Sequence, residues 1–138
     1  MDMRKFLSLA GAVLAVAAPL RAELAPEVYI ELQNKAAEVL EIRVDEVESK
    51  PKGLLDRSSY TETVKATVTG VTRTLSGAKK GDAITIIYHR PVPAKGWVGA
   101  SPPPQLKQGR AYTAWLAKGE GGTFSISARG MSFTRMAD

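Results

Sequence analysis

Few side chains in this sequence could carry out covalent chemistry. The 138 residues contain no cysteine and a single histidine, His89, which excludes a thiol nucleophile and a cysteine–histidine metal site. His89 could act as the base for a serine, because catalytic triads are defined by geometry and not by spacing. No serine lies in a G-x-S-x-G motif, however. We interpret His89 as a hydrogen-bonded strand-end residue at the rim of the fold, and expect no catalytic residue and no enzymatic activity.

The densest group of carboxylates is Asp45, Glu46 and Glu48. Glu46 and Glu48 would share one face of a strand, but the D-x-D-x-D-G pattern of a calcium loop is absent. Paired carboxylates could also hydrolyse glycosides, which requires a deep cleft between them. A small barrel filled by its own side chains has little room for such a cleft. We expect a solvated strand end, no metal site and no cofactor.

The segment Ser76–Asp82, SGAKKGD, contains the glycines and lysines of a phosphate-binding loop. Its spacing is not G-x-x-x-x-G-K-[ST], and it leads into an alternating apolar run instead of a helix. Lys79 and Lys80 are therefore interpreted as solvated charges in a turn.

The strongest candidate for binding is the segment Arg90–Arg110, which holds five prolines and three glycines. Prolines exclude a central strand here, and long irregular segments in compact domains are usually functional or disordered. Trp97 either contacts a partner or plugs the loop onto the body, and plugging is favoured because tryptophan buries a large apolar area. If a partner binds, we expect Tyr88, Arg90 and Trp97 to contact it.

The first residues, Met1–Ala22, have the features of a secretory signal peptide. Basic residues precede an apolar run at Phe6–Ala18, and small residues offer cleavage sites after Ala22 or after Ala17. The apolar run is shorter than a membrane span. We expect cleavage after Ala22 and a periplasmic or secreted protein, without disulfides or a lipid-bearing cysteine.

Cleavage after Ala22 would leave residues 23–138, which we expect to form a single domain. The net charge falls from +5 to +3, because three basic residues and one acidic residue leave with the signal. The remaining basic residues are scattered along the chain, which is not the pattern of a nucleic-acid surface. A cysteine-free exported chain is typical of a bacterial periplasmic protein.

Most of the remaining chain alternates between apolar and polar residues, as strands do. The alternation covers 37–48, 60–75, 83–89, 111–117 and 123–128, with a short edge at 131–133 and turns at 49–59 and 118–122. A phase shift around Asp45–Glu46 predicts a β-bulge there. A second shift, at Gly70, favours a bulge or sharp bend over a glycine tolerated in a flat sheet. Pro26–Ala36 fits either a short helix or an extended arm.

These elements predict an all-β fold, a small OB-like Greek-key barrel of five to six strands with at most one short N-terminal helix. From Ala37 to Phe133 the chain resembles OB-fold barrels of the netrin and tissue-inhibitor-of-metalloproteinase type. The resemblance lies in the order of a bent strand, then KKGD before AITIIYH, then QLKQGRAYTAWL before a terminal hairpin. Leu106, Gly109 and Tyr112 carry the motif. Those inhibitors bind the protease zinc through an N-terminal cysteine that this chain lacks, so their function is not implied here.

The function predicted from these observations is an exported, non-catalytic binding or interaction module that uses the barrel face and the 90–110 loop. OB-type barrels present a curved face and loops to ligands, and a strand edge can also accept an extended peptide. We expect a protein or peptide partner, no nucleic acid and no membrane span. A structural, envelope-associated or self-associating protein is the alternative, and a hydrolase using His89 is the third reading; the oligomeric state is open.

Overall fold

The computed structural model describes residues 25–97 and 99–137. The predicted signal peptide therefore lies outside the described residues. The described chain contains one α-helix, six strands and two short 3-10 turns. In chain order these are α2 (Pro26–Lys35), β1 (Glu38–Pro51), β2 (Ser59–Arg73), β3 (Ala83–Pro91), β4 (Ala111–Lys118), η2 (Glu120–Gly122), β5 (Phe124–Ile126), η3 (Arg129–Met131) and β6 (Phe133–Arg135). None of the helices in this part of the chain is long and apolar enough to cross a membrane.

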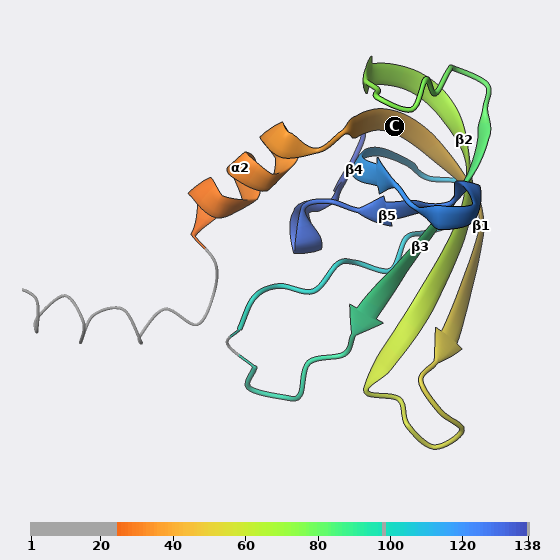
Figure 1. The fold of residues 1–138 in the computed structure, drawn as a ribbon. Helices are drawn as coiled ribbons and strands as arrows, with labels where there is room; N and C mark the ends of the chain where they lie inside the picture. Colours follow the sequence, from red (N-terminus) through yellow and green to blue (C-terminus); the bar gives the residue numbers. More distant parts are fainter. Residues whose placement is uncertain (1–24, 98, 138) are drawn as a thin grey trace, which may run out of the picture.

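Five of the strands form a closed barrel (Figure 1). The neighbours run in the order β1-β2-β3-β5-β4, and β4 pairs back onto β1 to close the cylinder. All of these pairs are antiparallel except β3–β5, which is parallel and joined only at Ile86↔Phe124. β6 pairs with another part of β4. The predicted OB-like all-β barrel is confirmed.

The predicted β-bulge at Asp45–Glu46 and the predicted irregularity at Gly70 both lie in the long pair β1–β2. Val44 pairs with Ala66 and Glu46 pairs with Lys65, which leaves Asp45 unopposed. Farther along, Ile42 pairs with Val68 while Glu41 pairs with Gly70, and the ladder shifts by one residue between them. A Cβ on Gly70 would lie 2.8 Å from the Glu41 carboxylate, so glycine lets this side chain cross the bulge.

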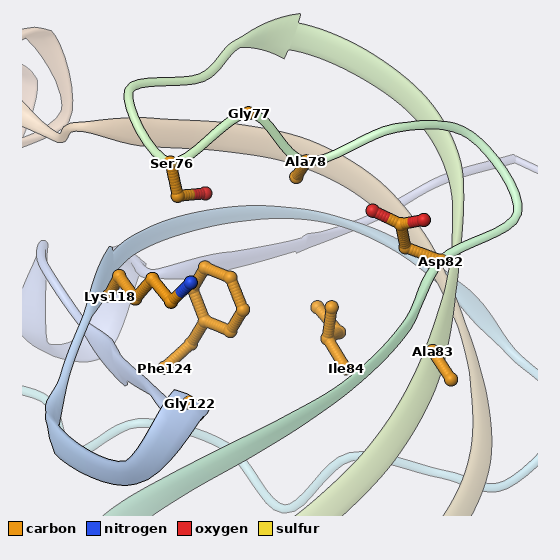
Figure 2. A pocket seen from close by; sticks show the side chains of 9 residues that line it. All are labelled: Ser76, Gly77, Ala78, Asp82, Ala83, Ile84, Lys118, Gly122 and Phe124. Atoms are coloured by element: carbon orange, nitrogen blue, oxygen red, sulfur yellow. The ribbon is translucent and has the colours of Figure 1, made fainter.

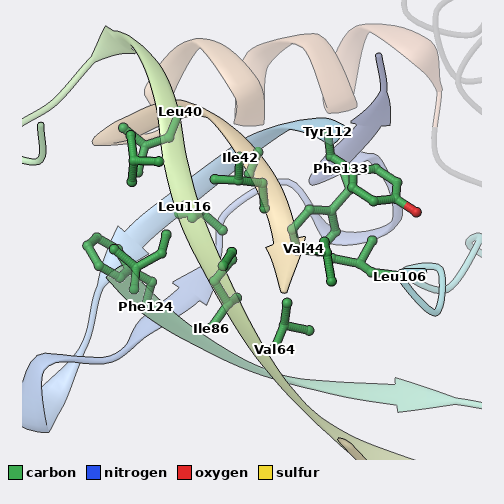
Figure 3. Close-up of a cluster of buried hydrophobic side chains, with 14 of the residues drawn as sticks. Leu40, Ile42, Val44, Val64, Ile86, Leu106, Tyr112, Leu116, Phe124 and Phe133 are labelled. Atoms are coloured by element: carbon green, nitrogen blue, oxygen red, sulfur yellow. The ribbon is translucent and has the colours of Figure 1, made fainter. Parts of the chain in front are cut away.

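The inward residues of the strands form one apolar core (Figure 3). Leu40, Ile42, Val64, Ile86 and Leu116 are all fully buried. They stand at every second position of their strands, which is how an alternating sequence fills a small barrel. No disulfide contributes to this core, since the chain has no cysteine.

Pro26–Lys35 is helical, so the extended-arm alternative is wrong. Arg73 fixes the end of α2 by donating from Nη1 to the carbonyls of Asn34 (3.0 Å) and Ala36 (2.6 Å). Gln33 donates from Nε2 to the Met131 carbonyl over 2.9 Å, which joins the helix to η3. These bonds use helix-end carbonyls that would otherwise lack partners.

Several boundaries differ from the sequence predictions, among them those of β1, β3 and β6. β1 continues to Pro51, so the loop after it is shorter than the predicted 49–59. Antiparallel pairing with β2 holds these polar residues in the strand. The final strand is β6, Phe133–Arg135, and not 131–133, because Met131 ends a 3-10 turn. β3 likewise extends to Pro91.

Candidate functional site

One end of the molecule extends beyond the barrel wall. β1 pairs with β4 only from Glu38 to Arg43, yet β1, β2 and β3 stay paired out to Pro51 and Pro91. The segment 92–110, without helix or strand in its described residues, runs beside this three-stranded extension (Figure 1). We call the extension and this segment the loop end.

A buried ion pair lies on the inner face of the extension. Glu62 is fully buried, and Arg90 Nε donates to its Oε1 over 2.6 Å. Ser49 Oγ donates to the other carboxylate oxygen, and Gln105 Nε2 donates to Ser49 Oγ over 2.8 Å. The Arg90 guanidinium also lies 4.7 Å from the centroid of the Tyr60 ring. Partners on three strands and the loop therefore satisfy both charges, which a buried pair requires.

Tyr88 fixes the loop to the barrel. Its side chain is buried and its hydroxyl donates to the Pro104 carbonyl over 2.6 Å. Burial raises the pKa of Tyr88, and the nearby Glu62 carboxylate raises it further, so the hydroxyl stays protonated and keeps donating. Contrary to the prediction, Tyr88 has almost no surface with which to contact a partner, and it supports the loop from below.

Trp97 is exposed, with 59% of its surface accessible, so the predicted plug is wrong. Its indole Nε1 donates to the Ala100 carbonyl over 3.2 Å, and its ring lies so close to Gly99 that an added Cβ would be 2.0 Å from Cζ2. Gly96, at φ +86°, supplies the turn before it. The loop presents the tryptophan in a fixed orientation instead of burying it.

Trp97 forms one wall of an apolar pocket of about 250 Å³. The other lining residues are Pro91, Pro93, Ala94, Ala100 and Pro102. Prolines restrict the backbone on both sides, so much of the pocket's shape is set before any ligand arrives. The volume suits one aromatic or aliphatic side chain better than a larger organic ligand.

The edge of β3 next to this pocket is free in the described part of the chain. Hydrogen bonds run from Val92 N to the Ser58 carbonyl and from Val68 N to the Asp82 carbonyl. The backbone groups of Asp82, of Val92 and of every second residue between them therefore point toward β2. Alternation then directs the backbone N–H and C=O of His89 away from β2. Beyond Ile86↔Phe124 no described strand pairs on that side. Pro91, which has no N–H, limits this edge to a short stretch.

The side chains of the other sequence candidates join neither the Glu62–Arg90 pair nor the Trp97 pocket. The His89 side chain is exposed at the position opposite Thr61, so it lies on the outer face and not with Glu62. Asp45 accepts from Thr67 Oγ1 (2.6 Å) and from Arg43, and these contacts lower the pKa of Asp45. Among residues 25–97 and 99–137, no group of acidic or histidine side chains is arranged to hold a metal ion.

A second pocket, of about 190 Å³, lies between the β2–β3 turn and η2 (Figure 2). Most of its polar groups are already bonded within the protein. Ser76 donates to the buried carboxylate of Glu38, and Asp82 accepts from the Lys79 backbone. Only Lys118 directs a charged group toward it without a hydrogen bond or salt bridge among the described contacts, which makes this pocket the weaker candidate.

Sequence reasoning missed Glu62 and Glu38, the two buried carboxylates. Glu62 has a visible signal, since it stands two residues before Val64 and therefore on the inward face of β2. Arg90 stands two residues after the buried Tyr88 and therefore on the inward face of β3. Two opposite charges at inward positions of neighbouring strands predict a buried ion pair.

No protein-family model, curated protein or solved structure matches this chain, so the functional argument rests on its own geometry.

Proposed function

We propose that the protein is a non-catalytic binding module that captures an extended peptide at the loop end. An apolar side chain of the peptide enters the Trp97 pocket, and its backbone pairs with the short free edge of β3. The observation that carries this proposal is an exposed tryptophan, fixed by its own loop, on a pocket that begins at Pro91 where the β3 edge ends. Adding a strand to an open edge is a common mode of peptide recognition.

The surroundings of the pocket support rigid recognition. Tyr88 and Gln105 bond the loop to the barrel, and Arg90 holds the end of β3 through Glu62. A binding surface that is ordered beforehand loses less conformational entropy when the ligand arrives. Arg90 is thus a positioning residue in this proposal, and Trp97 is the contact residue.

The ligand chemistry follows from the lining. The pocket is apolar and takes an aliphatic or aromatic anchor, while Lys95 lies on the same loop and favours an acidic neighbour of that anchor. Secretion, suggested by the leader, is part of this proposal and would place the peptide outside the cytoplasm.

The experiment is selection from a displayed library of linear peptides. We expect enriched peptides with one apolar anchor whose affinity falls at least about tenfold for Trp97→Ala, as for a central aromatic contact. Leu75→Ala is the matched control, because Leu75 is exposed on the turn between β2 and β3. Failure to enrich any sequence, or equal binding by the Trp97 variant, would contradict the proposal.

Self-association is the second candidate, favoured by the same free edge. Two β3 edges could pair antiparallel across a twofold axis. Sedimentation velocity over a range of concentrations separates the two functions. A dimer lost on His89→Pro, which removes the outward N–H, would favour self-association over peptide capture.

A further inference from the structure

The turn between β1 and β2 exposes two adjacent leucines. Leu54 is 90% accessible and Leu55 is 94% accessible, more than any other large hydrophobic residue that the structure describes. Both lie between the end of β1 and the start of β2, the connection drawn as the loop at the bottom of Figure 1, and neither belongs to the apolar core. Folding gains nothing from apolar surface left in water. The two adjacent leucines are therefore a candidate contact surface for a binding partner.

The tip is held by its own backbone. Gly53 and Asp56 exchange hydrogen bonds across the two leucines, at 3.4 and 3.2 Å, and Lys52 N donates to the Ser59 carbonyl over 3.0 Å. The Asp56 carboxylate accepts from the backbone and the hydroxyl of Ser58. The acid of this turn is therefore committed to shaping it, while the leucines project from a closed hairpin.

Three cations flank the leucines. Lys50, Lys52 and Arg57, together with Pro51, Gly53 and Leu54, line a groove of about 300 Å³. Within the described chain none of the three forms a salt bridge. Positive charge and apolar surface thus occur side by side, and Asp56 is the single acid between Lys50 and Arg57.

We propose that this hairpin tip docks onto an anionic lipid bilayer. Leu54 and Leu55 enter the boundary between headgroups and acyl chains, and Lys50, Lys52 and Arg57 contact lipid phosphates. Apolar insertion combined with basic residues is how peripheral proteins hold to anionic membranes. The tip lies outside the Trp97 pocket, and its partner differs in kind from the peptide proposed above.

Charge and shape favour a bilayer over a protein partner. A second copy of the tip would bring like charges together, which is unfavourable across an interface. The apolar part is a narrow, convex pair of side chains, whereas stable protein interfaces need a broad complementary surface. A soft bilayer accepts such a tip without a matching cavity.

Vesicle co-sedimentation tests the proposal with the whole protein. We expect binding to vesicles containing phosphatidylglycerol and little binding to phosphatidylcholine alone, with affinity falling as salt screens the charges. L54S/L55S should bind the anionic vesicles at least about tenfold more weakly, while K50Q/K52Q/R57Q should lose the preference for anionic lipid. Equal binding by wild type and L54S/L55S would overturn the proposal, as would no binding by wild type.

Two controls keep the result specific. Leu75→Ser removes another highly exposed leucine, from the β2–β3 turn, and should leave vesicle binding unchanged. Trp97→Ala should lose peptide but retain vesicles, so the membrane proposal and the peptide proposal can fail separately. Unchanged thermal unfolding of each variant shows that a loss of binding is not a loss of fold. A dimer in vesicle-free solution that L54S/L55S abolishes would also overturn membrane docking.

Discussion

Arg90 on β3 donates a 2.6 Å hydrogen bond to Glu62 on β2, and the Glu62 carboxylate is completely buried. This pair stands where the apolar core ends and the polar interior of the loop end begins. Through Ser49 and Gln105 it also connects to the proline-rich segment. The ion pair therefore links the shape of the loop end to the integrity of the barrel.

Replacing Glu62 by glutamine should destabilise the protein. Arg90 would lose its charged partner, and we expect a loss of about 3 kcal/mol, the low end for a broken buried pair. The reason is that the Arg90 side chain is 17% accessible and can still reach water. Urea unfolding measures the change, with exposed Glu48→Gln as a control expected to change little. Similar stability of both variants would contradict the buried pair.

Glu38 should make stability depend on pH. Burial raises its pKa, but hydrogen bonds from Thr74, Ser76 and the Leu75 and Ser76 backbone outweigh burial, so the pKa lies below the ordinary value of 4.5. A carboxylate with a lowered folded pKa contributes stability above its unfolded pKa and loses it as pH falls through the folded pKa.

The variant Glu38→Gln tests this contribution. At pH 7 we expect it to be less stable than wild type by about 2 kcal/mol, the loss of hydrogen bonds to a charged group. The difference should shrink as the pH falls below 4.5. Urea unfolding at several pH values measures it, and a gap that stays constant with pH would argue against an ionised Glu38.

Trp97→Ala should leave stability nearly intact. The side chain is 59% accessible and contacts its own loop, so we expect a loss under about 1 kcal/mol. Trp115→Phe removes the partly buried tryptophan, so that all tryptophan fluorescence comes from Trp97. In that background acrylamide should quench the fluorescence strongly, because Trp97 is exposed. A large drop in melting temperature would instead place Trp97 in the fold's interior.

Tyr88→Phe should loosen the loop while leaving the barrel folded. The lost hydrogen bond to Pro104 is worth about 1 kcal/mol, and the carbonyl it leaves must find water. We expect faster proteolysis within 92–104. Tyr60→Phe is the matched control, because it keeps the ring beneath Arg90 and no described hydrogen bond involves its hydroxyl. Equal proteolysis of the two variants would show that Tyr88 does not fix the loop.

Local patterning predicted much of the fold. The phase shifts at Asp45–Glu46 and Gly70 located both register shifts of the β1–β2 ladder, because side chains must return to the same face after an extra residue. Tyr88 was predicted as a contact residue from its nearness to the loop. Its alternation with Ile84 and Ile86 already placed it inside, so the periodic signal should have outweighed proximity.

Other features depend on partners that are distant in sequence. Glu38 looks like an ordinary polar residue at the start of a strand, and its burial depends on Thr74, Leu75 and Ser76, which reach it only after β2 folds back. Trp97 depends on Gly99 and Ala100 closing a local turn. Tryptophan size alone favours burial, and the loop geometry that overrides it is not periodic.

The single parallel pair Ile86↔Phe124 gives the cylinder a seam. The other adjoining strands of the barrel share longer ladders, including the β1–β4 ladder that closes it, but a single residue pair joins β3 to β5. Local unfolding should begin at this pair, with the three-residue strand β5 separating from β3 while β1 and β2 stay paired. Amide protons of Phe124 and its neighbours would then exchange with deuterium well before those of the central β1–β2 ladder.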